Sequence, residues 1–238
     1  MNITNDNLLK GKNDIVLAGI KGSKAGTTLR HKILNSVSGT YKGGFFKNRK
    51  SLSWRAPYVC EALAKTYDLL QYKGNTIVDV GCAIGDYVKW FNDSGYVAWG
   101  IEGSQAAEEF MVTDQVSIWD LRYTLNMGSC ESKYDLAFSL EVAEHIEIEY
   151  AKIYVDNLIL LSDNILISAA APGQKGHGHV NCAPRQFWIN LFKEKGFSNM
   201  KEYENRWKTN LGSFGRTKKE LSSYYKNVIC FQRMGLHE

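Results

Sequence analysis

The chain has 238 residues, of which 44% are hydrophobic and 23% charged, and its formal net charge is +4. This length and composition fit one α/β domain with a modest extension, whose core is large enough to fold without disulfides or a metal. A long proline-rich linker is excluded, since only three prolines are present. The five cysteines are scattered without a C-x-x-C pair, which indicates free thiols rather than a disulfide framework.

Basic residues are concentrated in the first quarter of the chain. Residues 10–55 contain eleven lysines and arginines against a single acid, Asp14, and a second basic stretch covers 206–219. Such a segment is either a solvated face or a contact surface for an anionic substrate, including nucleic acid. We therefore treat 1–53 as a basic N-terminal extension that caps the protein or contacts substrate, and 54–238 as the main domain.

From residue 54 onward, helical periodicity alternates with short β-rich runs. Helices are predicted at 54–71, 86–92, 104–111, 148–161 and 184–195. Strands are predicted at 76–80, 96–101, 116–119, 134–140, 164–170, 201–206 and 227–233. This alternation predicts a Rossmann-like, mostly parallel sheet with helices on both faces, in which a ligand binds at the carboxyl ends of the strands.

The most apolar region, 158–171, is interrupted by Asp163 and Asn164 and is too short to span a bilayer. The first ten residues are polar and do not form a signal peptide. We therefore expect a cytoplasmic protein that has no membrane partner.

Three acidic residues follow three successive predicted strands. Residues 78–85 read VDVGCAIG, a strand that ends with Asp79 and a G-x-x-x-G turn into a helix, where backbone N–H groups can approach a ligand closely. Glu102 ends the second strand, where a carboxylate can accept hydrogen bonds from ribose hydroxyls. Asp120 follows the third strand. Together these acids predict a nucleoside-containing ligand.

Two other interpretations of the glycine turn remain. A dinucleotide-binding site normally has G-x-G-x-x-G, but position 83 is alanine, whose methyl group would crowd a pyrophosphate. The turn is also compatible with a purely structural β-turn-α unit. The three acids at successive strand ends argue against both of these alternatives.

The segments VDVGCAIGDYV, GIEGS, YDLAFSLEVAEHI and SAAAPG resemble the successive motifs of class I S-adenosylmethionine-dependent methyltransferases (type 11/23-like), over about 76–197. The resemblance implies a seven-stranded sheet with an antiparallel last strand, and S-adenosyl-L-methionine as cofactor. It also implies a set of cofactor-binding residues, grouped by the part of the cofactor they contact. These are Asp79, Gly81, Cys82 and Gly85 for the methionine part, Glu102 and Gly103 for the ribose, Trp119 and Asp120 for the adenine, and Ser139, Leu140 and Glu141 beside the sulfonium.

The segment EVAEH contains the candidate catalytic residues Glu141, Glu144 and His145. If it starts a helix, these three side chains share one face. The motif resembles the E-x-x-E-H of metal-dependent small-RNA 2′-O-methyltransferases and ubiquinone-biosynthesis O-methyltransferases. That resemblance implies a Mg²⁺ ion held by the three residues and completed by His179.

The same motif also occurs in relatives without a metal, in which His145 would act as a general base or contact substrate, or would have only a structural role. His177 and His179 lie in a glycine-rich loop and are equally compatible with a latch over the cofactor.

Several absent motifs narrow the methyl acceptor. The sequence has no N-P-P-Y or D-P-P-Y after the fourth predicted strand, no Pro-Cys pair, and no lysine in 164–171. We expect an O or N nucleophile on a small molecule, a sugar or an RNA end. The alternative is a catalytically silent methyltransferase-like module that binds RNA or a protein. The sequence gives no indication of oligomeric state.

Overall fold

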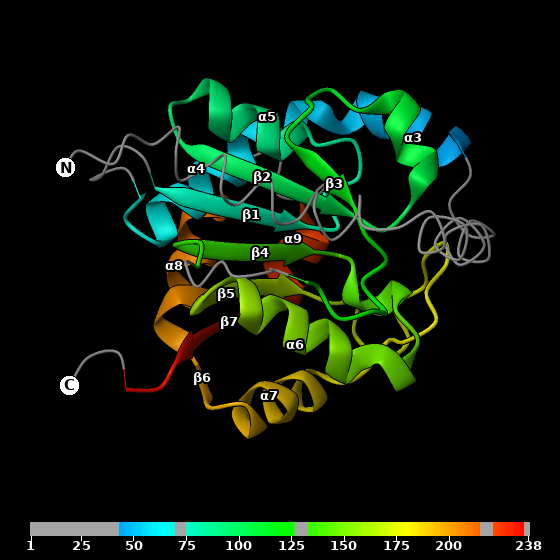
Figure 1. Cartoon of the computed structure of the whole chain (residues 1–238). Coiled ribbons are helices and arrows are strands. Elements are labelled where there is room, and N and C mark those ends of the chain that lie inside the picture. The colour runs from blue at the N-terminus through cyan, green and yellow to red at the C-terminus, as the bar shows by residue number, and fades with distance from the viewer. Residues whose placement is uncertain (1–42, 70–74, 127–132, 215–220, 236–238) are drawn as a thin grey trace.

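A computed structural model describes residues 43–69, 75–126, 133–214 and 221–235. Most of the predicted basic extension, 1–42, lies outside these ranges. The described chain folds into one central sheet between two layers of helices (Figure 1). Among the described residues, no helix has both the length and the apolar character needed to cross a membrane.

The sheet has seven strands in the order β3-β2-β1-β4-β5-β7-β6. The strands are β1 (Thr76–Val80), β2 (Val97–Glu102), β3 (Val116–Ile118), β4 (Leu136–Leu140), β5 (Asn164–Ser168), β6 (Phe197–Asn199) and β7 (Val228–Arg233). The first five strands are parallel, and β7 runs antiparallel to both β5 and β6. The predicted Rossmann-like sheet is therefore confirmed, including its antiparallel last strand.

The chain reverses its direction of progress across the sheet between β3 and β4. Strands β2 and β3 are added on one side of β1, and β4 returns to the other side. A crevice forms at such a switch point, outside the carboxyl ends of the strands, because the connections on either side lead away from it. This topology places the ends of β1, β2, β3 and β4 around one site.

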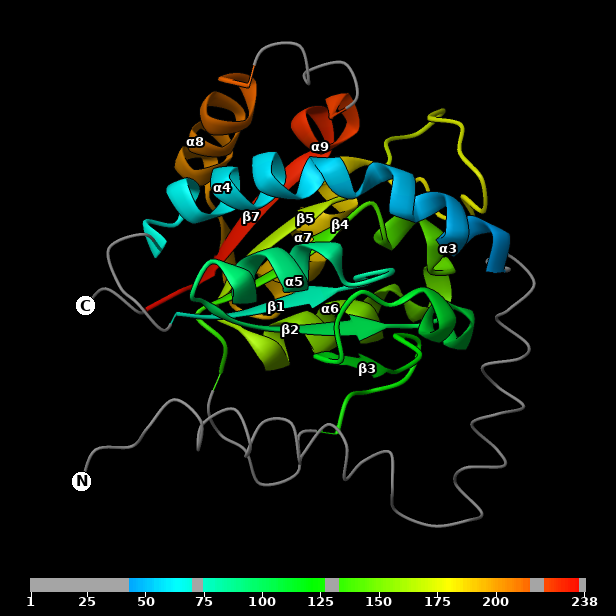
Figure 2. The ribbon, with the colours of Figure 1, turned by 90° about the horizontal axis from the view of Figure 1, so that it is seen from above.

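Helices cover both faces of the sheet because alternate side chains of each strand point to opposite faces. Ile77 of β1 belongs to a buried cluster on one face that includes side chains of α4 (Ala56–Thr66), α5 (Asp86–Asp93), α8 (Lys201–Gly212) and α9 (Ser222–Asn227). Val78 belongs to the cluster on the other face, with side chains of α6 (Ala151–Leu161) and α7 (Arg185–Glu194). Figure 2 shows these two layers.

Short 3-10 helices occur where the sequence predicted longer or regular helices. Residues 104–111 contain η3 (Gln105–Phe110), and the predicted helix 148–161 begins as η5 (Ile148–Tyr150) before α6. The predicted helix 54–71 begins within η1 (Lys50–Arg55), and its end lies outside the described residues. The 53/54 domain boundary falls inside η1 and stays a prediction.

The predicted strand at 201–206 is wrong, because these residues form the first half of α8. Glu204, Trp207 and Leu211 are buried at helical spacing along this element. Glu204 accepts hydrogen bonds from Arg185 and Asn199, which lie on other elements. These tertiary contacts favour the helix over the strand.

The segment that precedes α4 packs on the site edge of the sheet. Phe46 of α3 (Gly43–Arg49) is buried against Ile84 and Ala107, which follow β1 and β2. In Figure 2, α4 and α3 run one after the other across the molecule, below α8 and α9 in this view. Residues 43–49 therefore form part of the wall of the site.

Candidate functional site

A cavity of about 340 Å³ opens at the carboxyl ends of β1 to β4. Its size is in the range typical of small-molecule sites. Seven of the residues predicted from sequence line it. They are Gly81, Glu102, Gly103, Asp120, Leu140, Glu141 and His145.

The turn after β1 brings the backbone close to the loop after β4. Gly81 has φ +84°, and a Cβ atom there would lie 2.4 Å from Cγ2 of Val142. Ala83 also has a left-handed φ, +52°, a conformation that costs a non-glycine residue roughly 1–2 kcal/mol. The chain thus accepts local strain to form this turn, as is common at functional sites.

The carboxylate of Glu102 connects two loops of the cavity. One oxygen accepts a hydrogen bond from the N–H of Ala83 at 2.8 Å, and the other accepts one from the N–H of Ser104, also at 2.8 Å. Burial raises the pKa of Glu102 to about 7, although these backbone hydrogen bonds act in the opposite direction. The carboxylate is therefore held in a fixed orientation at the cavity wall.

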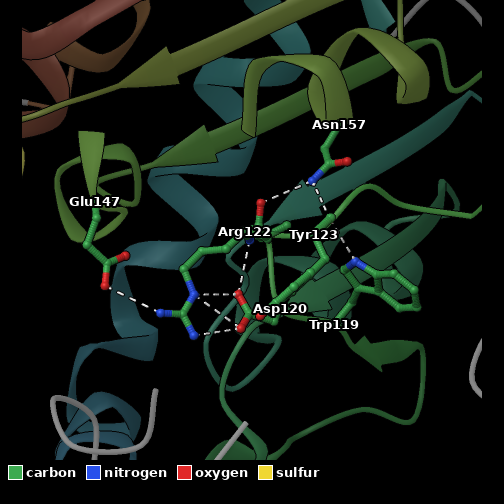
Figure 3. A network of polar contacts seen from close by, with 7 residues as sticks. Trp119, Asp120, Arg122, Tyr123, Glu147 and Asn157 are labelled. Carbon is green, nitrogen blue, oxygen red and sulfur yellow. Dashed lines mark hydrogen bonds and ion pairs between the residues drawn. The ribbon is translucent and has the colours of Figure 1, made fainter. Parts of the chain in front are cut away.

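Asp120, after β3, is paired with an arginine that the sequence analysis did not select. Arg122 donates from Nε and Nη2 to the two Asp120 oxygens at 3.1 and 2.9 Å, and its Nη1 lies 3.3 Å from Glu147 Oε1 (Figure 3). Arg122 and Glu147 both line the cavity. They connect the loop after β3 to the loop after β4. The proposed contact of Asp120 with adenine stays a prediction.

A buried asparagine of α6 forms hydrogen bonds to the loop that carries Asp120. Asn157 of α6 accepts from Leu125 N–H at 2.8 Å and donates to the carbonyls of Leu121 and Tyr123 at 3.1 and 3.0 Å. Figure 3 shows the amide of Asn157 directed at this loop. The isolated asparagine gave no sequence signal, because its partners lie more than 30 residues away.

Several predicted cofactor residues do not line the cavity. The Ser139 hydroxyl donates to Val80 O at 2.6 Å and accepts from Tyr154 at 2.7 Å, so it is used inside the core. Asp79 is buried beneath the turn, and burial raises its pKa. Three further predicted cofactor residues also lie outside the cavity lining, namely Cys82, Gly85 and Trp119. Their contacts with a cofactor stay predictions.

The predicted common face of Glu141, Glu144 and His145 is wrong for Glu141. Glu141 has φ +55°, and the helical turn η4 starts only at Ala143. The N–H of Glu141 donates to the carbonyl and hydroxyl of Ser168, which holds this residue outside the turn. Its carboxylate instead accepts from Asn227 at 3.2 Å and from Gln174 at 3.5 Å.

Glu144, His145 and His179 form a compact cluster. Their potential ligand atoms all lie within 4.8 Å of one another. Glu144 is fully buried, and within the described part of the chain neither of its oxygens has a hydrogen-bond partner. Burial, with a smaller effect of Glu141, raises the Glu144 pKa to about 8. Of the four predicted metal ligands, the structure brings these three together without Glu141.

Hydrogen bonds to backbone carbonyls select the tautomer of both histidine rings. Nδ1 of His145 lies 3.0 Å from the carbonyl of Gly178, and Nδ1 of His179 lies 3.0 Å from that of Gln174. Because a carbonyl only accepts, each ring carries its proton on Nδ1 and a lone pair on Nε2 when neutral. Burial lowers the pKa of His145, which favours the neutral ring. His177 does not line the cavity.

No family model matches the sequence, and no curated protein matches it. Among solved structures, the chain is similar to the plantazolicin methyltransferase BpumL in complex with SAH, at 12% identity, with a TM-score of 0.52 over 84% of this chain and 90% of that one. It is also similar to magnesium protoporphyrin IX methyltransferase from Synechocystis PCC 6803 with bound SAM, at 18% identity and a TM-score of 0.48 over 69% and 78% of the two chains. The chain has the class I S-adenosylmethionine-dependent methyltransferase fold.

Replacing Asn157 with alanine should destabilise the protein by roughly 2–4 kcal/mol, because it leaves the N–H of Leu125 and the carbonyl of Leu121 without this partner, while the carbonyl of Tyr123 keeps its hydrogen bond from Trp119. Denaturant unfolding measures this free energy. Asn190→Ala, at an exposed asparagine of α7, is the control and should change stability little. Equal stability of the two variants would show that the loop does not depend on Asn157.

Glu144 should make stability fall as pH rises. Its pKa is raised from 4.5 to about 8 in the folded protein, so the folded state binds more protons between these values, and stability is lost through this window. Glu144→Gln should remove this dependence. With chelator present, the unfolding free energy of the variant relative to the wild type should rise by roughly 1–4 kcal/mol from pH 5 to pH 8.5. Glu149→Gln, at an exposed site, should not show this trend. If the unfolding free energies of the wild type and of Glu144→Gln changed with pH in parallel, the burial of an ionisable Glu144 would be contradicted.

Proposed function

We propose that the protein is an S-adenosylmethionine-dependent methyltransferase that acts on an O or N nucleophile of a small molecule, a sugar or an RNA end. The observation that carries the proposal is the Glu102 carboxylate, which is buried and oriented at the wall of a cavity at the switch point of a methyltransferase fold. Two hydroxyls of a ribose match such a double acceptor.

The strand order supports one orientation of the cofactor. Neighbouring strands lie about 4.8 Å apart, so the ends of β3, β2 and β1 span roughly the length of an adenosine. The adenine would lie by Asp120, the ribose by Glu102, and the sulfonium above Gly81. The methyl group would then face the end of β4, where Glu141 and His145 line the cavity.

His145 has the geometry of a general base for a hydroxyl acceptor. Its ring is neutral, and its Nε2 lone pair can take the proton of the hydroxyl as the acceptor oxygen attacks the methyl carbon. The carbon–sulfur bond breaks, and its electron pair stays on sulfur. Glu144 has an oxygen within 4.8 Å of the ring nitrogen, so its ionised form would stabilise the imidazolium that forms. An amine acceptor would need this base less.

A divalent cation is a second role for the same cluster, favoured by the buried Glu144 carboxylate, which has no hydrogen-bond partner among the described residues and lies 3.9 Å from Nε2 of His179. Glu144, His145 and His179 would hold it, and when bound it would lower the pKa of an acceptor hydroxyl and fix its oxygen. Two imidazole nitrogens suit Mn²⁺, Co²⁺ or Zn²⁺ better than the Mg²⁺ that the motif resemblance implies, since Mg²⁺ prefers oxygen ligands. The Nε2 atom of His145 cannot both ligate a cation and accept a proton, so the two roles exclude each other.

The cofactor proposal predicts pH-dependent binding of S-adenosylhomocysteine. Ribose hydroxyls donate to the ionised form of Glu102, whose pKa is about 7, so affinity should rise as pH increases from 6 to 8. Glu102→Gln should bind more weakly and without this rise. Calorimetric titration measures both effects. If S-adenosylhomocysteine did not bind to the folded wild-type protein, the methyltransferase proposal would be contradicted. The alternative of a catalytically silent module that binds RNA or a protein would then be favoured.

The cation proposal predicts one Mn²⁺ site in metal-stripped protein. Electron paramagnetic resonance titration should give one equivalent of bound Mn²⁺ that is lost in both Glu144→Gln and His179→Asn. Glu149→Gln should retain it. Absence of Mn²⁺, Co²⁺ and Zn²⁺ binding in the wild type would exclude the cation and favour His145 as the base.

A further inference from the structure

Glu141 is a carboxylate in the cavity wall that has no ion-pair partner among the described residues. The other acidic residues of the lining are satisfied. Glu102 accepts hydrogen bonds from two backbone N–H groups, and Asp120 and Glu147 share the guanidinium of Arg122. Within the described lining, Glu141 is therefore the acidic side chain whose charge neither a cation nor a backbone N–H group balances.

Two amide side chains orient this carboxylate. Asn227, at the end of α9, donates to one oxygen at 3.2 Å, and Gln174, in the loop after β5, donates to the other at 3.5 Å. The Asn227 amide also donates to Oε1 of Gln174 at 3.0 Å, so the two amides hold each other. A carboxylate offers about four lone-pair sites, which leaves room for a ligand. The neutral amides fix the direction of Glu141 without neutralising its charge.

A second hydrogen-bond acceptor lies at the same end of the cavity. The Nδ1 proton of His145 is donated to the carbonyl of Gly178 at 3.0 Å, which leaves Nε2 of the neutral ring as an acceptor. An ammonium group has three donors and no acceptor. It therefore matches both the charge of Glu141 and the hydrogen-bonding capacity of His145.

An anionic group is a poor match for this end of the cavity. The lining contains two arginines, and neither contacts Glu141 among the described residues. Arg122 is paired with other carboxylates, and Arg49 lies 3.5 Å from the Tyr224 hydroxyl. A phosphate or carboxylate of an acceptor would meet Glu141 with like charge.

An apolar side chain lines the cavity near these acceptors. Val180 is 59% exposed, and its N–H donates at 2.9 Å to the carbonyl of Glu144, the residue before His145. This hydrogen bond holds Val180 against the turn that carries His145. Because an isopropyl group has no polar atom, contact with it favours an apolar ligand surface over the hydroxyls of a sugar.

We propose that the methyl acceptor is an amine on an apolar frame, which Glu141 binds as an ammonium ion while the frame packs on Val180. The inference rests on the proposed function and selects the N nucleophile of a small molecule. Before transfer, the ammonium group loses one proton, which the Nε2 lone pair of His145 can accept. The nitrogen then bonds to the methyl carbon while the carbon–sulfur bond breaks and its electron pair stays on sulfur. The methylated product again carries a positive charge.

The test compares two probes with the same carbon frame, phenethylamine and phenethyl alcohol, on metal-stripped protein saturated with S-adenosylhomocysteine. NMR chemical-shift titration measures their dissociation constants. The wild-type complex should bind the amine about 10- to 100-fold more tightly, as expected for charge-assisted hydrogen bonds. Glu141→Gln should remove this preference by weakening the amine alone, and Glu149→Gln, at an exposed site, should retain it.

Val180→Ser should weaken both probes by a similar factor, about 3- to 10-fold, because it removes apolar contact that the two probes share. Unchanged binding of both probes to this variant would overturn the contact with Val180. Thermal unfolding of each variant confirms that it is folded.

Three results would overturn the amine assignment while leaving the methyltransferase proposal intact. The complex of the wild type with S-adenosylhomocysteine could bind the two probes equally, or it could bind neither. The third result is a Glu141→Gln variant that loses affinity for both probes in equal measure, which would show that Glu141 only holds the loops in place. A wild-type protein that does not bind S-adenosylhomocysteine would instead refute the proposed function, and the inference with it.

Discussion

The carboxylate of Glu102 is the interaction on which the cavity depends. Its two oxygens fasten the N–H of Ala83, after β1, and the N–H of Ser104, after β2, to one side chain. Both hydrogen bonds require the ionised form, while burial favours the neutral form and brings the pKa to about 7. The free protein therefore holds this group near its titration point. A ligand that donates further hydrogen bonds would shift it to the ionised form, with release of a proton on binding.

Close backbone contact at the switch point is the second requirement. Gly81 leaves no room for a side chain because Val142, from the loop after β4, fills that space. Ala83 and Glu141 also adopt left-handed backbone conformations on either side of this contact. The strain is maintained because each N–H is bound elsewhere, at Glu102 and at Ser168. The two loops thus hold each other in place at the wall of the cavity.

The sheet and much of the cavity wall could be predicted from the sequence. Strand ends in a parallel sheet meet at one edge, and the acidic residues lie at those ends. It was insufficient where distant contacts decide local structure. The first half of α8 was predicted to be a strand because the helix depends on Glu204 and its partners on other elements. Glu141 was placed on a helix face, but Ser168 of β5 holds it outside the turn. Arg49, which lines the cavity, was one of eleven basic residues in an aperiodic segment, and only the packing of α3 distinguishes it.

The charges of the site are arranged for a positive charge that moves rather than disappears. In the proposed reaction, the sulfonium loses its positive charge when the methyl group leaves. Carboxylates near sulfur would oppose this step, because they stabilise the charged cofactor more than the transition state. If His145 takes the acceptor proton, the positive charge reappears on its ring, at the same end of the cavity as Glu141. An amine acceptor would carry the charge itself as an ammonium group at the same end. In both cases Glu141, which lines this end of the cavity, would face one positive charge before and after transfer. In the proposed reaction, the acidic end of the cavity would therefore serve the reacting atoms.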